Sequence, residues 1–482
     1  MAATAPSYLQ PARFERLGTG LLIMALLGCL AVVLLLAWRA PELLLFLPIV
    51  MVALAGGVTL FRYPKLNLTV VLVGFIALTD ISEGINAIEI VYGLYFMAFI
   101  AYWAATHIWV YKTKLLVTLA DKAMFAFLIL FTLYMPLGYF FGAKPITIFN
   151  EWSALILLAV YFPIKEAVSR DPKQARIFLI ALGIIGAFVA IRNLINYQQV
   201  LLAATQAWQV SRGRVAMNDN LLMVSSVFGL ILVIFSRTLK ARAGGAMLFG
   251  MYFSGLILTQ SRGYWLAFMF AAGCMFLIVP AAQKRRIIGI IAVMITGLLG
   301  AALVLFGDVV MVVIFGLAER MASLQTAVTT DLSLVNRFRE SAAAWQYIEV
   351  NPILGYGLGV PYEFYDIVHE YTDNDAFVHN AYINLWYKFG LHGLVITLIA
   401  WVGSAWDGVK AFRKMPLPIS IRFAGIVGAC ALAGFSISAI TSNPWYINDT
   451  LFMLGFLMGL GSGAYQYALA RDASDVQAVE TA

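Results

Sequence analysis

The sequence predicts an all-α polytopic membrane protein, and composition and hydropathy carry this prediction. Of the 482 residues, 62% are hydrophobic and 12% are charged, and the mean hydropathy is +0.87, whereas a soluble domain is about half apolar and a quarter charged. Apolar runs long enough to cross a bilayer core of about 30 Å recur along the chain. Backbone groups in lipid must pair within their own segment, so these runs are predicted to be helices. A soluble protein is excluded.

About 12 to 14 membrane spans are expected. The first, Gly18–Ala37, is too long for a signal peptide and has no small-residue cleavage site, so it is predicted to be an anchored helix. The three cysteines, Cys29, Cys274 and Cys430, lie within apolar runs, and no disulfide is expected. The spans are predicted to begin near Gly18, Glu42, Leu66, Ile90, Lys122, Thr147, Arg176, Asn220, Ala246, Gly263, Ile287, Gly390, Arg422 and Thr450.

The basic residues predict the orientation of the chain in a bacterial inner membrane. If the N-terminus is cytoplasmic, most of the 32 Lys and Arg residues fall in cytoplasmic loops, which places both termini in the cytoplasm. The net charge of +7 then reflects membrane topology, and no nucleic-acid partner is expected. Four segments follow: a transmembrane bundle over 1–306, a periplasmic helical loop carrying the active site over 307–389, C-terminal transmembrane helices over 390–470, and a disordered cytoplasmic tail over 471–482.

Arginines in the predicted periplasmic loops are the more informative cations, because a cation near the apolar core usually marks a binding or transport site. They fall in three loops. The loop over 196–219 holds Arg212 and Arg214, a short turn holds Arg262, and the segment over 307–389 holds Arg320, Arg337 and Arg339.

The segment over 307–389 is predicted to contain two helices. Residues 308–326 have apolar residues at helical spacing beside a polar face, which is typical of a helix lying on the membrane surface. A second helix is expected over 333–350, ended by Asn351-Pro352 because the residue before proline avoids the helical region. A glycine-rich turn follows at 355–359, where backbone can approach a ligand closely.

Three fragments resemble the membrane-embedded O-antigen ligase and polymerase family. The first is Ser261-Arg262-Gly263 at the start of a helix. The second is Asn336-Arg337, followed by Trp345 and by Asn351-Pro352-Ile353-Leu354-Gly355-Tyr356-Gly357. The third is His379-Asn380-Ala381-Tyr382, which continues to Gly390 and Gly393 as H-N-x9-G-x-x-G, the pattern of the ligases. The resemblance extends from about Arg212 to Ser404, and the first two hundred residues match only as a hydrophobic helix bundle.

The resemblance implies a glycosyltransferase that uses a glycan linked to undecaprenyl diphosphate. Breaking the bond to the anomeric carbon leaves negative charge on the diphosphate. Arginine offers several fixed donors to phosphate oxygens and stays charged when half-buried, so Arg262 and Arg337 can stabilise this leaving group without a metal. The resemblance implies that they are the diphosphate clamp, and that no cofactor is needed.

His379 is the candidate catalytic base, because a neutral imidazole can take the proton of an attacking hydroxyl near neutral pH. Attack opposite the departing diphosphate would invert the anomeric centre. Further sugar or phosphate contacts are assigned to Arg212, Arg214, Asn220, Asn380, Tyr356 and Tyr382.

Each candidate has a structural alternative. Arg262 could extend to lipid head groups, and Arg337 could pair with Glu340 on a solvated helix face. His107 and His392 are expected at helix ends in structural roles, and His369 is left undecided. Asp373-Asn374-Asp375 has the D-x-D pattern that some glycosyltransferases use to hold a cation, but the signal is weak and no metal site is predicted.

Three functions remain open. The ligase interpretation transfers a finished glycan onto lipid A-core, or in one variant onto a protein. The polymerase interpretation extends lipid-linked repeat units of an O-antigen or exopolysaccharide. The third is a flippase or transporter of lipid-linked glycans. Such proteins tend to place charged residues near the bilayer midplane, within inverted repeats. In this sequence the charged residues are predicted at one membrane face, and no repeat is found. The H-N-x9-G-x-x-G pattern favours the ligase.

Overall fold

The computed structural model describes residues 64–76, 87–111, 114–203, 218–281, 332–414 and 416–480, with isolated positions between 284 and 300. The predicted spans near Gly18 and Glu42, the surface helix over 308–326, and both Arg212 and Arg214 lie outside these residues.

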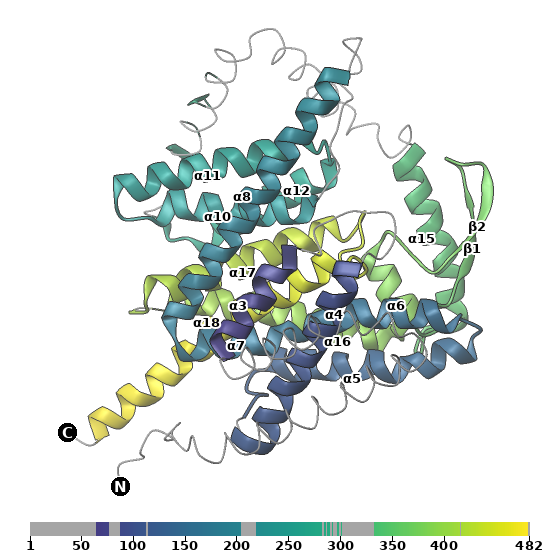
Figure 1. The fold of residues 1–482 in the computed structure, drawn as a ribbon, viewed down its shortest axis with the longest axis horizontal. Coiled ribbons are helices and arrows are strands. Elements are labelled where there is room, and N and C mark those ends of the chain that lie inside the picture. The colour runs from purple at the N-terminus through teal and green to yellow at the C-terminus, as the bar shows by residue number, and fades with distance from the viewer. Residues whose placement is uncertain are drawn as a thin grey trace, which may run out of the picture.

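The described chain is almost entirely helical, which confirms the predicted fold class (Figure 1). Seven of its helical segments are long and apolar enough to cross a membrane, and α10 and α12 are shorter apolar helices. The elements are α3 Pro64–Gly74, α4 Ala87–Ala105 with a π-helical end Thr106–Tyr111, α5 Leu119–Phe140, α6 Pro145–Leu155, the 3-10 segment η4 Ile156–Val160, α7 Tyr161–Arg170, α8 Pro172–Ala203, α10 Asp219–Phe235, α11 Leu239–Leu258, α12 Arg262–Ile278, α15 Leu332–Val350, β1 Tyr362–Asp366, β2 Tyr371–Asp375, α16 Ala381–Arg413, α17 Ile419–Ser438 and α18 Asn448–Glu480.

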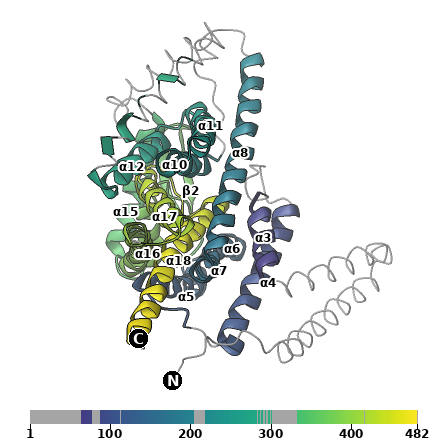
Figure 2. The ribbon, with the colours of Figure 1, turned by 90° about the vertical axis from the view of Figure 1, so that its left-hand side faces the viewer.

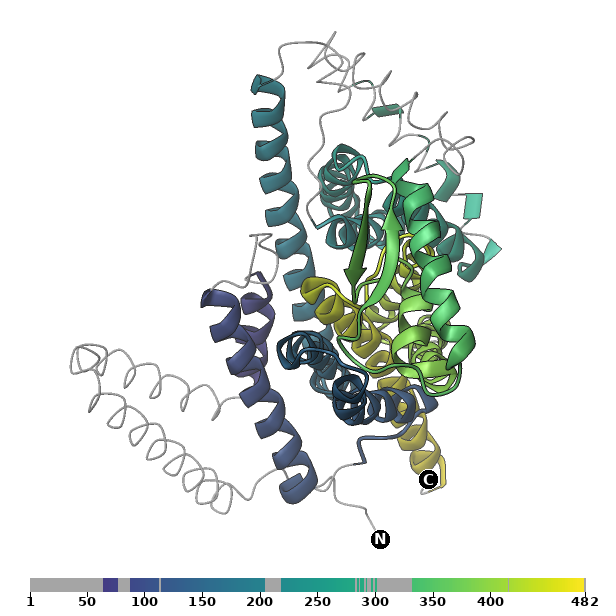
Figure 3. The same cartoon turned by 90° about the vertical axis from the view of Figure 1, so that its right-hand side faces the viewer.

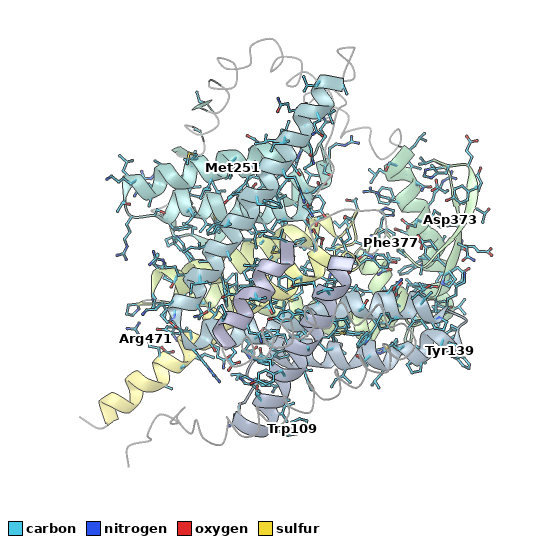
Figure 4. The ribbon with its side chains drawn as sticks, in the orientation of Figure 1. Trp109, Tyr139, Met251, Asp373, Phe377 and Arg471 are labelled. Atoms are coloured by element: carbon cyan, nitrogen blue, oxygen red, sulfur yellow. The ribbon has the colours of Figure 1, made fainter. Side chains whose placement is uncertain are left out.

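The helices form a bundle whose two ends differ. Helix α15 and the β1–β2 hairpin lie together at one end, which we call the hairpin end, at the right of Figure 1. Figure 3 views this end directly, with α15 and the hairpin in front of the bundle. The C-terminus projects from the opposite end, towards the viewer in Figure 2, where α3, α4 and α8 lie along one side. Figure 4 likewise shows Asp373 and Phe377 far from Arg471.

Helix α18 packs closely on η4 and α7 through a stripe of small residues. A Cβ atom added at Gly455, Gly459 or Gly463 would lie 2.7 to 2.9 Å from a backbone carbonyl oxygen of η4 or α7. Helices in membranes gain stability from such close approach, because lipid provides no hydrophobic driving force between them. The stripe therefore holds α18 at the centre of the bundle.

Helix α16 is broken at Gly390, where the sequence predicts that a span begins. Gly390 has non-helical backbone angles, φ 65° and ψ −178°, so α16 has one helical part over 381–389 and a longer one over 391–413. The break accommodates the chain after α15: the N–H of Leu391 donates to the Pro352 carbonyl at 2.9 Å. A side chain at Gly390 would place its Cβ 1.7 Å from the Ile353 carbonyl oxygen.

Three further expectations can be compared with the structure. The helix predicted over 333–350 is confirmed by α15. The segment over 307–389 also contains the antiparallel β1–β2 hairpin, which the sequence analysis did not predict. The disordered tail after Arg471 is a wrong prediction, because α18 continues to Glu480. Residues 472–480 contain no proline or glycine, and Ala, Gln and Glu favour continuation of a helix.

Candidate active site at the hairpin end

The α17–α18 loop, residues 439–447, is where the candidate elements meet. The hydroxyls of Tyr264 on α12 and Ser442 lie 3.4 Å apart, so the loop contacts the helix that begins with Arg262. The Nη1 atom of Arg337 on α15 donates to the Thr441 carbonyl at 2.6 Å. Sequence reasoning named neither loop residue.

The same loop also holds the segment that carries His379. The side-chain amide of Asn443 donates to the Val378 carbonyl at 2.8 Å, and the N–H of Ala381 donates to the Ala439 carbonyl at 2.9 Å. These two bonds lie on either side of His379 in the sequence. Arg262, Arg337 and His379 are far apart in the chain, yet all three lie on elements that contact this one loop.

Arg262 is half-buried at the first position of α12, after the N-cap Ser261. Gln260 has φ 52°, a left-handed conformation that turns the chain sharply between α11 and α12. Helices α10, α16 and α18 also begin at this end of the bundle. Helix N-termini carry partial positive charge and unpaired N–H groups, so this end of the bundle favours an anion.

Arg337 and Arg339 occupy different environments on α15. Arg337 is half-buried and contacts the α17–α18 loop, whereas Arg339 is exposed. The sequence analysis named Glu340 as the alternative partner of Arg337. In the structure Glu340 is only 4% exposed in its side chain, and its carboxylate contacts His379.

His379 and Glu340 form a hydrogen-bonded pair between the start of α16 and α15. The Nδ1 atom of His379 lies 2.8 Å from Oε2 of Glu340, and the backbone N–H of His379 donates to the same oxygen at 3.2 Å. The His379 side chain is 38% exposed, and its ring packs edge-on against Phe377 with centroids 4.7 Å apart. A half-exposed imidazole with one nitrogen bonded to a carboxylate is suited to proton transfer.

The predicted substrate-contact residues have structural partners. Asn380 caps α16, because its side-chain oxygen accepts from the N–H groups of Tyr382 and Ile383. The Tyr382 hydroxyl donates to the Ser436 carbonyl at 2.8 Å, and the Tyr356 hydroxyl donates to the Tyr347 carbonyl at 2.9 Å. Their contacts to substrate stay predictions.

Asn220 lies in a buried polar cluster at the starts of α10 and α18. Its amide and that of Asn218 donate to Asp449 at 3.3 and 2.9 Å, and Asn220 also bonds to Thr450. Arg192 of α8 donates to Asn218, which has φ 51°. The cluster joins α8, α10 and α18. Its central carboxylate, Asp449, was not predicted from the sequence. An acidic residue at the edge of an apolar run was the signal that could have identified it.

The glycine-rich turn over 355–359 approaches protein backbone. Cβ atoms added at Gly355, Gly357 and Gly359, all with positive φ, would lie 2.3 to 2.9 Å from backbone atoms of α16, α5 and α6. The Gly359 N–H donates to Glu151 at 2.8 Å, and Glu151 forms an ion pair with Lys388, both about 4% exposed or less. The turn is thus part of the packing that fixes α15 on the bundle.

The D-x-D sequence lies on strand β2. Asp373 accepts from the N–H of Asn374 at 2.8 Å, and Asp375 accepts from the N–H of Phe377 at 3.3 Å. Within the ranges that the structure describes, no three His, Cys, Asp or Glu side chains are grouped closely enough to hold a metal ion. The prediction that no metal is used stays a prediction.

The other histidines bond to protein groups. His107 is buried and contacts Glu166 at 2.5 Å, and His392 contacts the Tyr134 hydroxyl at 2.8 Å, in keeping with their predicted structural roles. His369 is 66% exposed in the turn of the hairpin, and its hydrogen bond to Asp366 lowers the pKa of that carboxyl below its ordinary value.

The structure is that of a multi-pass helical membrane protein with two arginines and a histidine on elements that meet at one end of its bundle. Residues 246–398, from α11 into α16, match the family model described as O-antigen ligase. The match confirms the resemblance and supports, in general terms, a glycosyltransferase function of the O-antigen ligase or polymerase type. It includes Arg262, Arg337 and His379 but not Arg212 or Arg214. A comparison with curated proteins gives no match.

Proposed function

We propose that this protein is an inverting, metal-independent glycosyltransferase that transfers a glycan from undecaprenyl diphosphate to an acceptor hydroxyl at the periplasmic face of a bacterial inner membrane. The observation that carries the proposal is the convergence of Arg262, Arg337 and His379 on the α17–α18 loop. A diphosphate needs cations, and an attacking hydroxyl needs a base. The O-antigen ligase match over the same residues supports the same chemistry.

The proposed mechanism stabilises the negative charge that develops on the diphosphate leaving group. Arg262 and Arg337 bind the donor diphosphate, helped by the N-terminal end of α12. His379 takes the proton of the acceptor hydroxyl as its oxygen attacks the anomeric carbon. The bond between that carbon and the phosphate oxygen breaks with its electron pair left on the diphosphate, where the two guanidinium groups stabilise the growing charge. Because attack comes from the face opposite the leaving group, the anomeric configuration inverts.

The proposed topology places the hairpin end in the periplasm. The opposite end of the bundle holds the ends of α7, α16 and α18, with Arg170, Lys410, Arg413 and Arg471. Basic residues concentrate on the cytoplasmic side of membrane proteins. The lipid-linked donor would then reach the site from the outer leaflet, and lipid A-core would present its acceptor hydroxyl from outside.

Product analysis tests the proposal and separates the ligase from the polymerase. Purified protein is incubated with native lipid-diphosphate-linked glycan and lipid A-core, without added metal. A single glycan on lipid A-core is expected for the ligase that we propose. A ladder of lengthening lipid-linked chains would make the protein a polymerase. Transport of the donor without any new glycosidic bond would overturn the transferase proposal and favour a flippase.

A further inference from the structure

The geometry points to Glu340 as the positioning residue of the base: we propose that its carboxylate holds His379 with the proton on Nδ1, so that Nε2 faces the acceptor as the proton-accepting atom. This inference rests on the proposed function and deepens it. Oε2 of Glu340 lies 2.8 Å from Nδ1 of His379 and accepts from the backbone N–H of His379 at 3.2 Å. One contact holds the imidazole ring and the other holds the backbone of His379 against the same oxygen.

A carboxylate in this place determines the tautomer of a neutral imidazole. An ionised carboxylate only accepts hydrogen bonds, so the nitrogen that faces it must carry the proton. The lone pair then lies on Nε2. When that atom takes the acceptor proton, the ring becomes a cation beside a buried anion, which stabilises the charge that develops during the reaction.

Glu340 is itself held in place by Tyr362. The Tyr362 hydroxyl lies 3.2 Å from Oε1 of Glu340 and 2.8 Å from the Phe377 carbonyl. Burial and the adjacent Glu340 carboxylate raise the pKa of Tyr362, so its hydroxyl stays protonated, and its single proton is shared between this carboxylate and the Phe377 carbonyl. The carboxylate therefore has polar partners on both oxygens, although it is almost completely buried.

Helix α15 also links this pair to the diphosphate clamp. Arg337 and Glu340 are three positions apart, which places them on neighbouring surfaces of one helix. Arg337 contacts the α17–α18 loop, while Glu340 contacts His379. A single rigid helix thus sets the distance between the group that stabilises the leaving diphosphate and the group that orients the base.

The decisive experiment is nitrogen NMR of the full-length protein labelled with ¹⁵N-histidine. The chain has only four histidines, and His379→Ala identifies the signal. For the neutral ring we expect a protonated Nδ1 and an unprotonated Nε2 in the wild type. Glu340→Ala should introduce the form protonated on Nε2. A wild-type His379 protonated on Nε2, or a spectrum unchanged in Glu340→Ala, would overturn the inference.

Activity measurements complete the test. Glu340→Ala should lower kcat about 100-fold with a smaller change in KM for the donor, since general-base catalysis contributes about 10²- to 10⁴-fold. Glu340→Asp, which keeps the carboxylate, should recover part of the loss. Tyr362→Phe is the matched control: it leaves the pair between Glu340 and His379 and should cost less than about 10-fold.

The two proposals fail in different ways. A wild-type protein without transferase activity would overturn the proposed function and the inference together. An active wild type in which Glu340→Ala retains kcat, or in which His379 has the opposite tautomer, would overturn only the role of Glu340. If Glu340→Ala does not fold, the wild-type tautomer still decides the question.

Discussion

Arg337 donates from Nη1 to the Thr441 carbonyl at 2.6 Å and so joins α15 to the loop between α17 and α18. The contact connects a residue within the O-antigen ligase match to a loop beyond it. A guanidinium can keep this bond through one nitrogen and still offer other N–H groups to a phosphate, because its donors are arranged in a fixed fork.

This geometry predicts that Arg337→Lys is not a conservative change. Lysine is a point charge without the fork, so it cannot bind the Thr441 carbonyl and a phosphate with the same geometry. We expect Arg337→Lys and Arg337→Ala both to lower kcat/KM for the lipid-linked donor by about 10²- to 10³-fold. Arg339→Ala is the control, since Arg339 is exposed on the same helix. Equal losses in the Arg337 and Arg339 variants would contradict the clamp.

The buried pair of Glu151 and Lys388 predicts a large loss of stability when one partner is removed. Lys388→Met leaves the Glu151 charge buried and uncompensated, which costs about 3–5 kcal/mol. Thermal unfolding of the purified protein in detergent measures the loss. The double variant Glu151→Gln with Lys388→Met should regain much of it. A double variant less stable than Lys388→Met would show that the two charges do not act as a pair.

The bend at Gly390 predicts that an added methyl group is not tolerated. Gly390→Ala combines a positive φ with a Cβ that would overlap the Ile353 carbonyl oxygen. The backbone angles at this position, φ 65° and ψ −178°, are ones that essentially only glycine adopts and cost another residue about 1–3 kcal/mol, and the overlap forces the chain after α15 to move. We expect a lower unfolding temperature and a loss of transfer. Gly273→Ala is the control, because its Cβ would meet nothing within 4 Å. An unchanged Gly390→Ala protein would refute this account of the bend.

The hairpin carboxylates predict an outcome for metal removal. Asp373 and Asp375 accept hydrogen bonds from nearby backbone N–H groups, and asparagine keeps an oxygen that can do the same. Transfer by the double variant Asp373→Asn with Asp375→Asn, assayed in a chelator, should stay within a few-fold of the wild-type rate. Complete dependence of the wild type on an added divalent cation would require a different mechanism.

The fold class was accessible from sequence, and the candidate site residues could be named from it, because each has a local signal. Apolar runs predict helices wherever lipid is the solvent, and Asn351-Pro352 marks the end of α15. Arg262, Arg337 and His379 were recognised from short motifs. The roles of Glu340, Thr441 and Asn443 depend on contacts between helices far apart in the chain, which no local pattern specifies.

Other features were misjudged because tertiary packing overrides local preference. The turn over 355–359 reads as a flexible ligand loop, but its glycines allow backbone to pack on backbone. Gly390 breaks α16 where a span was expected to begin, but no local pattern indicates that the chain after α15 fills this break. The β1–β2 hairpin has few residues and alternates weakly, so it could not be distinguished from a loop.

The most direct test of the central claim is glycan transfer by His379→Ala compared with His369→Ala, in purified protein with the lipid-diphosphate-linked donor and lipid A-core. His369 lies in the exposed turn of the hairpin, whereas His379 lies between the α17–α18 loop and Glu340. The account predicts a loss of about 10²-fold or more for His379→Ala, and near wild-type transfer for His369→Ala, with both proteins folded. Near-normal transfer by His379→Ala would contradict it.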